Sequence, residues 1–250
     1  MRRSYVLNAP SRVPIKPQPV DYIIDILSQD AKAVGQDGSK LPPKKERWII
    51  CNQLGGGVAS DMAKDPAYAH MKLVPWAGVA ARLSPPCCVD TGTAYCFLPL
   101  PTRTKLPIHV HGYFELSPNR RDVWWGDDMA GDGKARAEWN RSIVADIAAP
   151  SYCRLVLSAI KSRSVTSETY ELLFPQRSLA GPWKVLGAHF YKGICNAPVL
   201  HSKNFSRGEW VSPAESLLLH GNENDEDPLD QSIHELNPKL TINDRHSLDS

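Results

Sequence analysis

The chain has 250 residues but no long apolar run, and this absence excludes one class of protein at once. No segment approaches the roughly 20 consecutive apolar residues that a membrane-spanning helix needs. The N-terminus also lacks the apolar core of a secretory signal, because Arg2 and Arg3 lead into a polar, proline-containing stretch. These absences predict a cytoplasmic protein.

A metal-binding or disulfide-forming cysteine pattern is missing as well. The chain has 6 cysteines, but no two of them form a CxxC pair. The spacing therefore predicts neither a zinc site nor a disulfide framework. In apolar strands and helices, reduced cysteine packs as a small hydrophobic residue.

The chain has little excess of either positive or negative charge. The net charge of +2 and the isoelectric point near 8.2 give no strong attraction to nucleic acid or to an anionic membrane. The first 47 residues are rich in Lys and Arg, whereas residues 222–230 are acidic. Neither segment interleaves aromatic residues with its charges, so we expect both to be solvated and expect no nucleic-acid or membrane partner.

The first half of the chain consists of β-branched and aromatic runs separated by turns, which is typical of strands. The short, turn-rich connections after the second strand favour an antiparallel meander. The residues 28–46 are expected to form a long loop at the edge of the sheet. The expected strands are Val20–Leu27, Arg47–Leu54, Lys72–Leu83, Thr93–Leu98 and Pro107–Leu116.

The second half changes to helical periodicity. A helix over Ala135–Ile147 is expected, and Pro150 suits the first turn of a second helix over Ser151–Ile160. The apolar run Trp183–Tyr191 fits either a helix or a strand. Strands followed by helices indicate an α+β fold with a mainly antiparallel sheet. The side chains expected to face inward are Trp139, Ile143, Val144, Ile147, Leu155, Val156 and Ile160.

These patterns divide the chain into four expected parts. A flexible N-terminal tail covers residues 1–19, and a sheet-plus-helix core covers residues 20–160. A tryptophan-containing extension follows over residues 161–220. The acidic tail over residues 221–250 is expected to be disordered.

Two histidines are candidates for metal chemistry. His109 and His111 lie two positions apart, so both rings face the same side of a strand. Such a pair could supply two ligands in a metal-dependent hydrolase, but no spacing provides a third ligand. We favour the alternative of two histidines on the solvated face of an antiparallel strand.

Two glycine-containing segments resemble ligand loops, but each lacks essential parts. Gly55–Gly57 has no phosphate-loop lysine or hydroxyl and no clear helix after it, so it is predicted to be a strand-ending turn. The loop with Asp127, Asp128 and Asp132 lacks the intermediate oxygen ligands of a calcium-binding EF-hand. Asp132 is instead expected near the N-cap of the next helix. No nucleophile-elbow pattern occurs, so we expect neither autonomous catalysis nor a metal or cofactor.

The segment Tyr95–Trp125 ends in a turn of unusual composition. Asn119, Arg120 and Arg121 are followed by Trp124 and Trp125, although Gly, Asn or Asp would suffice to reverse the chain. Such rings usually pack against or bind something. We therefore expect Asn119, Trp124 and Trp125 to build a structural turn that joins the sheet to the helix.

Five motifs occur in the order WIICNQLGGG, LVPWAGVAARL, AYCFLPLP, LPIHVHGYFELSPNRRDVWWGDD and AEWNRSIVADIAAPSY. Together they resemble the sacsin family. With weaker support from two later tryptophan-containing segments, the resemblance covers roughly residues 45–215. In that family, repeated modules each open with an ATPase domain similar to that of the ninety-kilodalton heat-shock chaperones. The resemblance implies the middle, post-ATPase part of such a module, acting as a chaperone or co-chaperone regulator. It implies heat-shock chaperones of the seventy-kilodalton class, client proteins and an ATPase domain as partners.

The chain departs from this family by lacking the glycine-rich lid and the nucleotide-binding motif of the ATPase domain. It is therefore expected to be a fragment or an isolated module, to which ATP hydrolysis is not assigned. By the family resemblance, Arg120 or Arg121 would sense the γ-phosphate of a nucleotide held by that domain, because the guanidinium fork fits phosphate. In the alternative, which we favour, these arginines pair with neighbouring aspartates and stack on Trp124. A scaffold domain with no nucleotide link is a third possibility.

Overall fold

The computed structural model describes residues 16–29, 42–86, 92–126, 130–175, 179–202, 209–215, 217–219 and 241–243. Its contacts divide the chain into two compact units, Met1–Phe190 and Tyr191–Ser250, which are described separately. Most of the predicted acidic tail lies outside the described residues, as do residues 30–41 of the predicted long loop.

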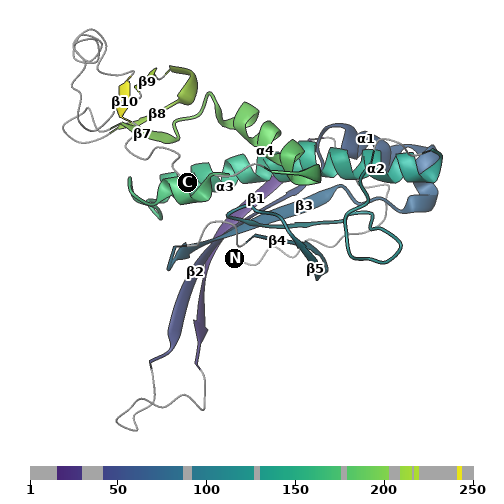
Figure 1. Cartoon of the computed structure of the whole chain (residues 1–250), viewed down its shortest axis with the longest axis horizontal. Coiled ribbons are helices and arrows are strands. Elements are labelled where there is room, and N and C mark those ends of the chain that lie inside the picture. Colours follow the sequence, from purple (N-terminus) through teal and green to yellow (C-terminus); the bar gives the residue numbers. More distant parts are fainter. Residues whose placement is uncertain are drawn as a thin grey trace. The chain divides into compact units, whose positions relative to one another are not determined.

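The first unit is built on a 6-stranded sheet with the order β1-β2-β3-β6-β4-β5 (Figure 1). The β4–β6 pair is parallel and the other neighbouring pairs are antiparallel. The predicted α+β fold with a mainly antiparallel sheet is thereby confirmed. The strands are β1 (Gln18–Ser28), β2 (Lys44–Leu54), β3 (Trp76–Ser84), β4 (Thr93–Cys96), β5 (Leu98–Arg103) and β6 (His109–Gly112).

The predicted meander is wrong in the second half of the sheet. Strand β3 pairs with β6, and β4 lies on the other side of β6 rather than beside β3. Residues 99–103, predicted as part of a connection, belong to β5, and Leu98, predicted as the end of the preceding strand, is its first residue. The left-handed backbone of Phe97 (φ 62°) turns the chain so that β5 pairs back onto β4. Two prolines made this segment resemble a loop, but an edge strand tolerates proline.

The long helix of the first unit runs without a break from Asp132 to Lys161. It comprises α2 (Asp132–Ser142), a π-helical segment (Ile143–Ala148) and α3 (Ala149–Lys161), so the predicted start of a new helix near Pro150 is wrong. Proline has no N–H, which leaves a carbonyl of the preceding turn without its helical donor. The carbonyl of Asp146 accepts a hydrogen bond from Gln53 Nε2 at 3.1 Å instead.

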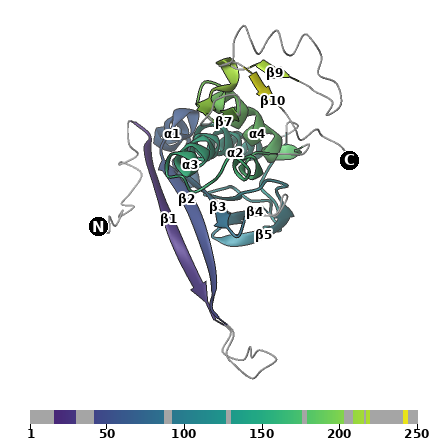
Figure 2. The ribbon, with the colours of Figure 1, turned by 90° about the vertical axis from the view of Figure 1, so that its left-hand side faces the viewer.

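This helix covers one face of the sheet (Figure 2). Alternate residues of β2 and β3 point toward it and are buried, as period-2 alternation requires. The predicted inward side chains of the helix are buried too, except that Ile160 is only partly covered. The fully or nearly fully buried contact set is Ile49, Cys51, Ala77, Val79, Ala81, Trp139, Ile143, Val144, Ile147, Leu155 and Val156.

A further correction concerns Gly55–Gly57, because helix α1 (Gly57–Lys64) does follow it. The carboxylate of Asp146 accepts a hydrogen bond from Ala59 N at 3.4 Å and so occupies the N-terminus of this helix. A Cβ at Gly56 would lie 2.6 Å from the carbonyl oxygen of Asp146, and one at Gly57 would lie 2.5 Å from its carboxyl group. The glycines therefore permit close packing against the long helix rather than phosphate binding.

The ambiguous run near residue 190 is helical and belongs to α4 (Gly181–Ile194), whose last residues lie in the second unit. Short 3₁₀ segments occupy Pro66–Met71, Tyr170–Leu173 and Pro213–Glu215. In the second unit, β7 (Leu200–Ser202) pairs antiparallel with β8 (Glu209–Val211). Strands β9 (Leu217–Leu219) and β10 (Thr241–Asn243) are parallel.

In the described part of the chain, one helix is long and apolar enough to cross a membrane, the 30-residue helix Asp132–Lys161. Its most apolar window is 56% buried inside the protein. A core helix passes the same test of length and composition, so this is weak evidence for a membrane span.

Candidate functional site

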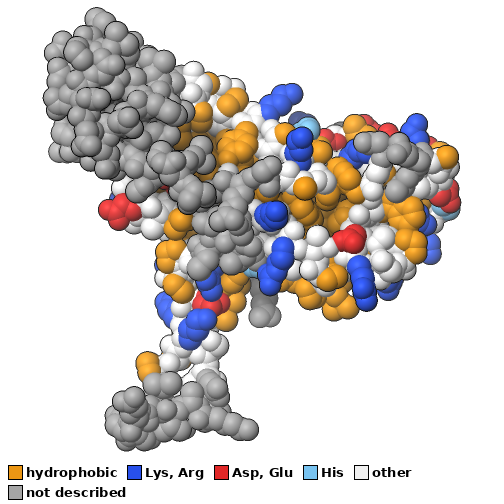
Figure 3. Space-filling model, viewed as in Figure 1, with side chains coloured by type: hydrophobic (Ala, Val, Ile, Leu, Met, Phe, Trp, Pro, Cys, Tyr) orange, Lys and Arg blue, Asp and Glu red, His pale blue; other side chains and the backbone are white. Residues whose placement is uncertain are grey.

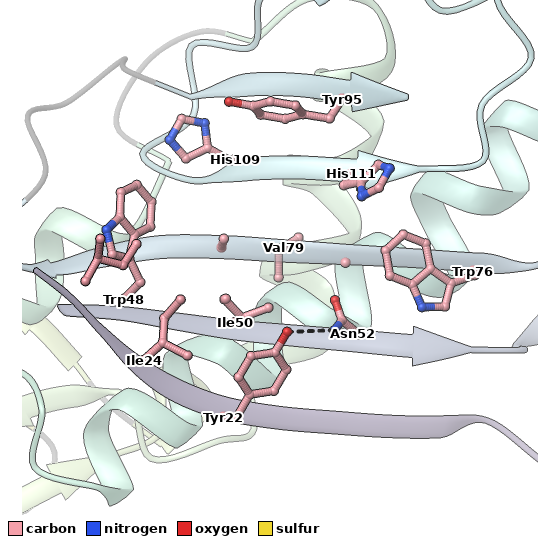
Figure 4. Close-up of a pocket in the computed structure, with 13 residues that line it drawn as sticks. Tyr22, Ile24, Trp48, Ile50, Asn52, Trp76, Val79, Tyr95, His109 and His111 are labelled. Carbon is pink, nitrogen blue, oxygen red and sulfur yellow. Dashed lines mark hydrogen bonds between the residues drawn. The ribbon is translucent and has the colours of Figure 1, made fainter. Parts of the chain in front are cut away.

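The face of the sheet opposite the long helix is open within the described part of the first unit, and it is rich in aromatic side chains (Figures 2 and 4). Alternation along each strand places these side chains together, because every second residue points away from the helices. They line a cavity of about 490 Å³. Val79, whose side chain belongs to the buried helix-covered set, also borders the cavity. The other lining residues, here called the open face, are Tyr22, Ile24, Ile26, Trp48, Ile50, Asn52, Trp76, Gly78, Ala80, Tyr95, His109 and His111.

His109 lies between two aromatic rings from different strands. Its ring centroid is 5.5 Å from that of Trp48 and 5.8 Å from that of Tyr95. Its Nδ1 accepts a hydrogen bond from the backbone N–H of Thr93 at 3.2 Å. The ring therefore ties β6 to the start of β4.

His111 repeats the arrangement one step along the strand. Its ring lies 5.0 Å from Trp76 and 5.8 Å from Phe97, both nearly edge-on. Its Nε2 accepts a hydrogen bond from the backbone N–H of Phe97 at 3.1 Å. The left-handed turn at Phe97 aims this N–H at the imidazole and leaves the phenyl ring 66% exposed.

Both imidazoles are held in the neutral form. Burial lowers the pKa of His109 below its ordinary value of 6.5, and the nearby Arg103 and Arg82 lower it further. Burial also lowers the pKa of His111. Because one nitrogen of each ring accepts a backbone hydrogen bond, the other carries the proton. His109 Nε2 and His111 Nδ1 are thus assigned as N–H donors.

The pair does face one side of a strand, but the rings are half-buried among aromatic side chains rather than solvated. One nitrogen of each ring is already used by a backbone N–H. Among the described residues, no group of three His, Cys, Asp or Glu side chains is placed to hold a metal ion. This geometry does not favour the alternative of a metal-dependent hydrolase.

The rest of the cavity lining is uncharged. Asn52 Nδ2 lies 3.5 Å from the hydroxyl of Tyr22, which is the contact drawn in Figure 4. Charge begins only at one end, where Glu46 accepts a hydrogen bond from Trp48 Nε1 at 3.2 Å and pairs with Lys44 and Arg82. A neutral aromatic surface with N–H donors is suited to bind an apolar group that carries a hydrogen-bond acceptor.

Three cysteines have thiol pKa values that burial raises, so they do not provide an activated nucleophile. Burial raises the pKa of Cys51 to about 12 and that of Cys153 to about 11. Burial also raises the pKa of Cys96. These three thiols are therefore protonated at neutral pH, and Cys87 and Cys88 lie outside the described residues.

The predicted arginine-tryptophan turn lies away from the cavity lining. Asn119 Oδ1 accepts hydrogen bonds from Ser117 Oγ at 2.7 Å and from the backbone N–H of Arg121 at 3.0 Å. Arg120 adopts a left-handed backbone (φ 56°), and the side chains of Arg120 and Arg121 are exposed. Their proposed contact with a nucleotide stays a prediction, which Arg121→Ala in a chain joined to an ATPase domain would test.

The rings of Trp124 and Trp125 make cation–π contacts with two arginines of the long helix rather than with Arg120 or Arg121. Arg136 of α2 lies 5.8 Å from the ring centroid of Trp124, and Arg141 lies 5.3 Å from that of Trp125. The alternative in which Arg120 or Arg121 stacks on Trp124 therefore needs correction. The aspartate of the turn itself, Asp122, accepts a hydrogen bond from Thr102, and Asp127 and Asp128 lie outside the described residues.

A buried asparagine connects this turn to the helix. Asn140 accepts a hydrogen bond from the Glu115 N–H at 2.9 Å. It donates to the carbonyls of Glu115 at 2.7 Å and Trp124 at 2.8 Å. The joint between sheet and helix that the sequence predicted thus depends on a helix residue that sequence reasoning missed.

Sequence reasoning also missed most of the open face. Trp48, Ile50 and Asn52 alternate with buried residues along one strand, and this period is visible in the sequence. Their proximity to Trp76 and the histidines depends on the order of strands, which local patterns do not contain.

On the face shown in Figure 3, Lys and Arg side chains are interspersed with hydrophobic and polar ones.

The first unit is thus an α+β fold with an aromatic, uncharged open face. No protein-family model and no solved structure matches the chain. Human sacsin is 32% identical to it over an alignment of 151 residues, and the match covers 55% of this chain. The resemblance to the sacsin family that the sequence motifs predicted is thereby confirmed. The chain spans 3% of the length of sacsin.

Proposed function

We propose that the chain is a protein-binding module of a sacsin-related chaperone system in the cytoplasm and has no catalysis of its own. The similarity to sacsin supports the chaperone context. The observation that carries the binding role is the open face, where large aromatic side chains remain partly exposed beside a cavity of about 490 Å³. Folding alone tends to bury such rings, and exposed apolar patches mark interaction sites.

The chemistry of the open face favours an apolar segment of an unfolded client protein. Aromatic rings provide contact area at a low entropy cost, and two imidazole N–H groups can donate to backbone carbonyls of a bound segment. The uncharged lining gives no reason for an anionic or cationic ligand to bind. Chaperones of the seventy-kilodalton class and an ATPase domain are proposed partners on the family resemblance alone.

Client binding can be measured with a fluorescently labelled, permanently unfolded protein and the full chain. The variant Trp48→Ala/Trp76→Ala removes two rings of the open face, and we expect its Kd to rise at least about ten-fold, which equals about 1.4 kcal/mol. Tyr191→Ala is the matched control, because Tyr191 is 47% exposed and does not line the cavity. Equal client affinity of the tryptophan variant and the wild type would refute the proposed binding face.

A further inference from the structure

The two edges of the sheet are built differently. At one edge, β5 contains Pro99 and Pro101, which have no N–H to offer a further strand. At the other edge, β1 pairs with β2 along its whole length from Gln18 to Ser28. Among the described strands β1 pairs with β2 alone, and residues 20–28 contain no proline. Figure 2 shows β1 as the outermost strand.

The β1 edge has little of the usual protection against strand addition, because Pro19 lies near its N-terminal end and the charges of Asp21 and Asp25 are paired with arginines. Its apolar side chains are exposed: Tyr22 is 44%, Ile26 is 42% and Leu27 is 67% accessible. Natural edge strands are commonly shortened, bulged or interrupted by charged or proline residues. A long, regular and apolar edge is a template for a further strand, and only an extended polypeptide can match its row of N–H and C=O groups.

The two faces beside this edge require different side chains from an added strand. On the open face, Tyr22, Ile24 and Ile26 form one wall of the cavity and call for apolar neighbours. On the helix-covered face, Asp21 pairs with Arg154 at 2.8 Å, and Asp25 pairs with Arg47 at 2.7 Å.

Cations outnumber carboxylates on this second face. Lys45 also pairs with Asp25, and Lys161 acts on Asp21, so four cations face two carboxylates. The excess of positive charge favours acidic residues on that side of an added strand. It disfavours a second copy of β1, because antiparallel pairing of two copies about Ile23 would bring two such basic clusters together.

We infer that the β1 edge is a strand-addition site for an extended segment of a partner protein in which apolar and acidic residues alternate. The apolar residues of the segment extend the wall of the cavity, and its acidic residues lie beside Arg47 and Arg154. This site uses the backbone of β1 and does not depend on client binding inside the cavity.

The probe is a labelled 11-residue peptide of alternating Val and Glu, titrated into the full chain at physiological salt. We expect saturable binding, and at least about ten-fold weaker binding of the matched peptide of alternating Val and Lys. N-methylation of one alternate set of peptide amides should abolish binding, whereas N-methylation of the other set should change the Kd less than about three-fold, because only one set faces β1.

The protein variants test the charge assignment. Arg154→Gln should weaken binding of the Glu peptide several-fold, and Arg154→Lys should restore it. Equal binding of the Glu and Lys peptides, equal binding of both methylated peptides or no binding of the parent peptide would each overturn the inference. A dimer of the chain that the peptide dissociates would assign the edge to a second copy instead. Trp48→Ala/Trp76→Ala should leave peptide binding within about three-fold, so this test and the client test can fail independently.

Discussion

The two faces of the sheet use the same strands in opposite ways. On β2, Ile49 and Cys51 point to the helix and are 1% and 0% exposed, whereas Trp48 and Ile50, which alternate with them, point to the open face and remain partly exposed. The helix-covered face carries small and aliphatic residues that let a long helix approach. The open face carries large rings and imidazoles that no described helix of the first unit covers. Residues that fold the unit and residues available for binding therefore alternate along one strand.

Small residues on β3 contribute to both faces. Ala77 and Ala81 are fully buried under the helix. Gly78 and Ala80 form part of the cavity lining. A Cβ at Gly78 would lie 2.1 Å from Asn52 Oδ1, so this glycine allows the Asn52 amide to lie across β3. Strand β3 therefore carries small side chains on both faces, and larger side chains from neighbouring elements pack over each face.

The largest expected effect contrasts one tryptophan from each face. Trp139 is fully buried under the sheet and donates from Nε1 to the Tyr113 carbonyl at 2.8 Å. Trp139→Ala should lower the free energy of unfolding by about 3–5 kcal/mol, since it removes a large core side chain. Trp76→Ala should cost less than about 1.5 kcal/mol, because Trp76 is partly exposed on the open face. Urea denaturation measures both, and equal losses would contradict the division into a folding face and a binding face.

A smaller effect is expected where the helix-covered face needs a glycine. Gly56→Ala would place a Cβ 2.6 Å from the Asp146 carbonyl oxygen, so we expect a loss of about 1–3 kcal/mol in unfolding free energy. Gly131→Ala is the matched control. Both glycines precede a helix with positive φ, but nothing lies within 4 Å of a Cβ at Gly131. A control loss as large as that of Gly56→Ala would assign the cost to backbone strain rather than to helix packing.

Gly56 also shows why local patterns predicted the strands better than their arrangement. Runs of β-branched and aromatic residues bounded by turns identified β1, β2 and β3, because a strand favours that composition in its own sequence. The role of Gly56 and Gly57 depends on Asp146, which is about ninety residues away and whose carbonyl has no helical N–H donor because residue 150 is a proline. A pattern read over ten residues does not contain that contact.

The site was predictable to a similar extent. That His109 and His111 share a face followed from their spacing. Their neutral state did not, because it depends on the N–H groups of Thr93 at the start of β4 and of Phe97 in the turn that follows β4. The cation-π contacts of Trp124 and Trp125 come from Arg136 and Arg141 on the helix for the same reason. Proximity in the sequence favoured Arg120 and Arg121 as partners of the tryptophan rings. In the folded protein both side chains are exposed on the turn instead.

The smallest expected effect is on the pH dependence of stability, which has opposite signs for titratable groups on the two faces. The pKa of His109 and that of His111 are lowered from 6.5 in the folded protein, so the unfolded chain binds protons first as the pH falls. Stability should therefore decrease as the pH falls below about 6.5, until the lower folded pKa values are passed, by at most about 1.4 kcal/mol per pH unit for each histidine. On the helix-covered face, burial raises the pKa of Asp146 above 3.8. That carboxyl group works in the opposite sense, because the folded state retains its proton longer as the pH rises.

The pH dependence can be assigned by replacing each group with a neutral side chain of similar shape. In His109→Asn/His111→Gln, amide oxygens take the places of Nδ1 and Nε2 as acceptors for the Thr93 and Phe97 N–H groups. Urea denaturation between pH 5 and 7 should then show a shallower decline than the wild type, whereas Asp146→Asn should alter the profile only at lower pH. An unchanged slope in the histidine variant would mean that these imidazoles titrate normally in the folded protein. The open face would then carry charge at mildly acidic pH, and an uncharged client segment would lose its advantage over an acidic one there.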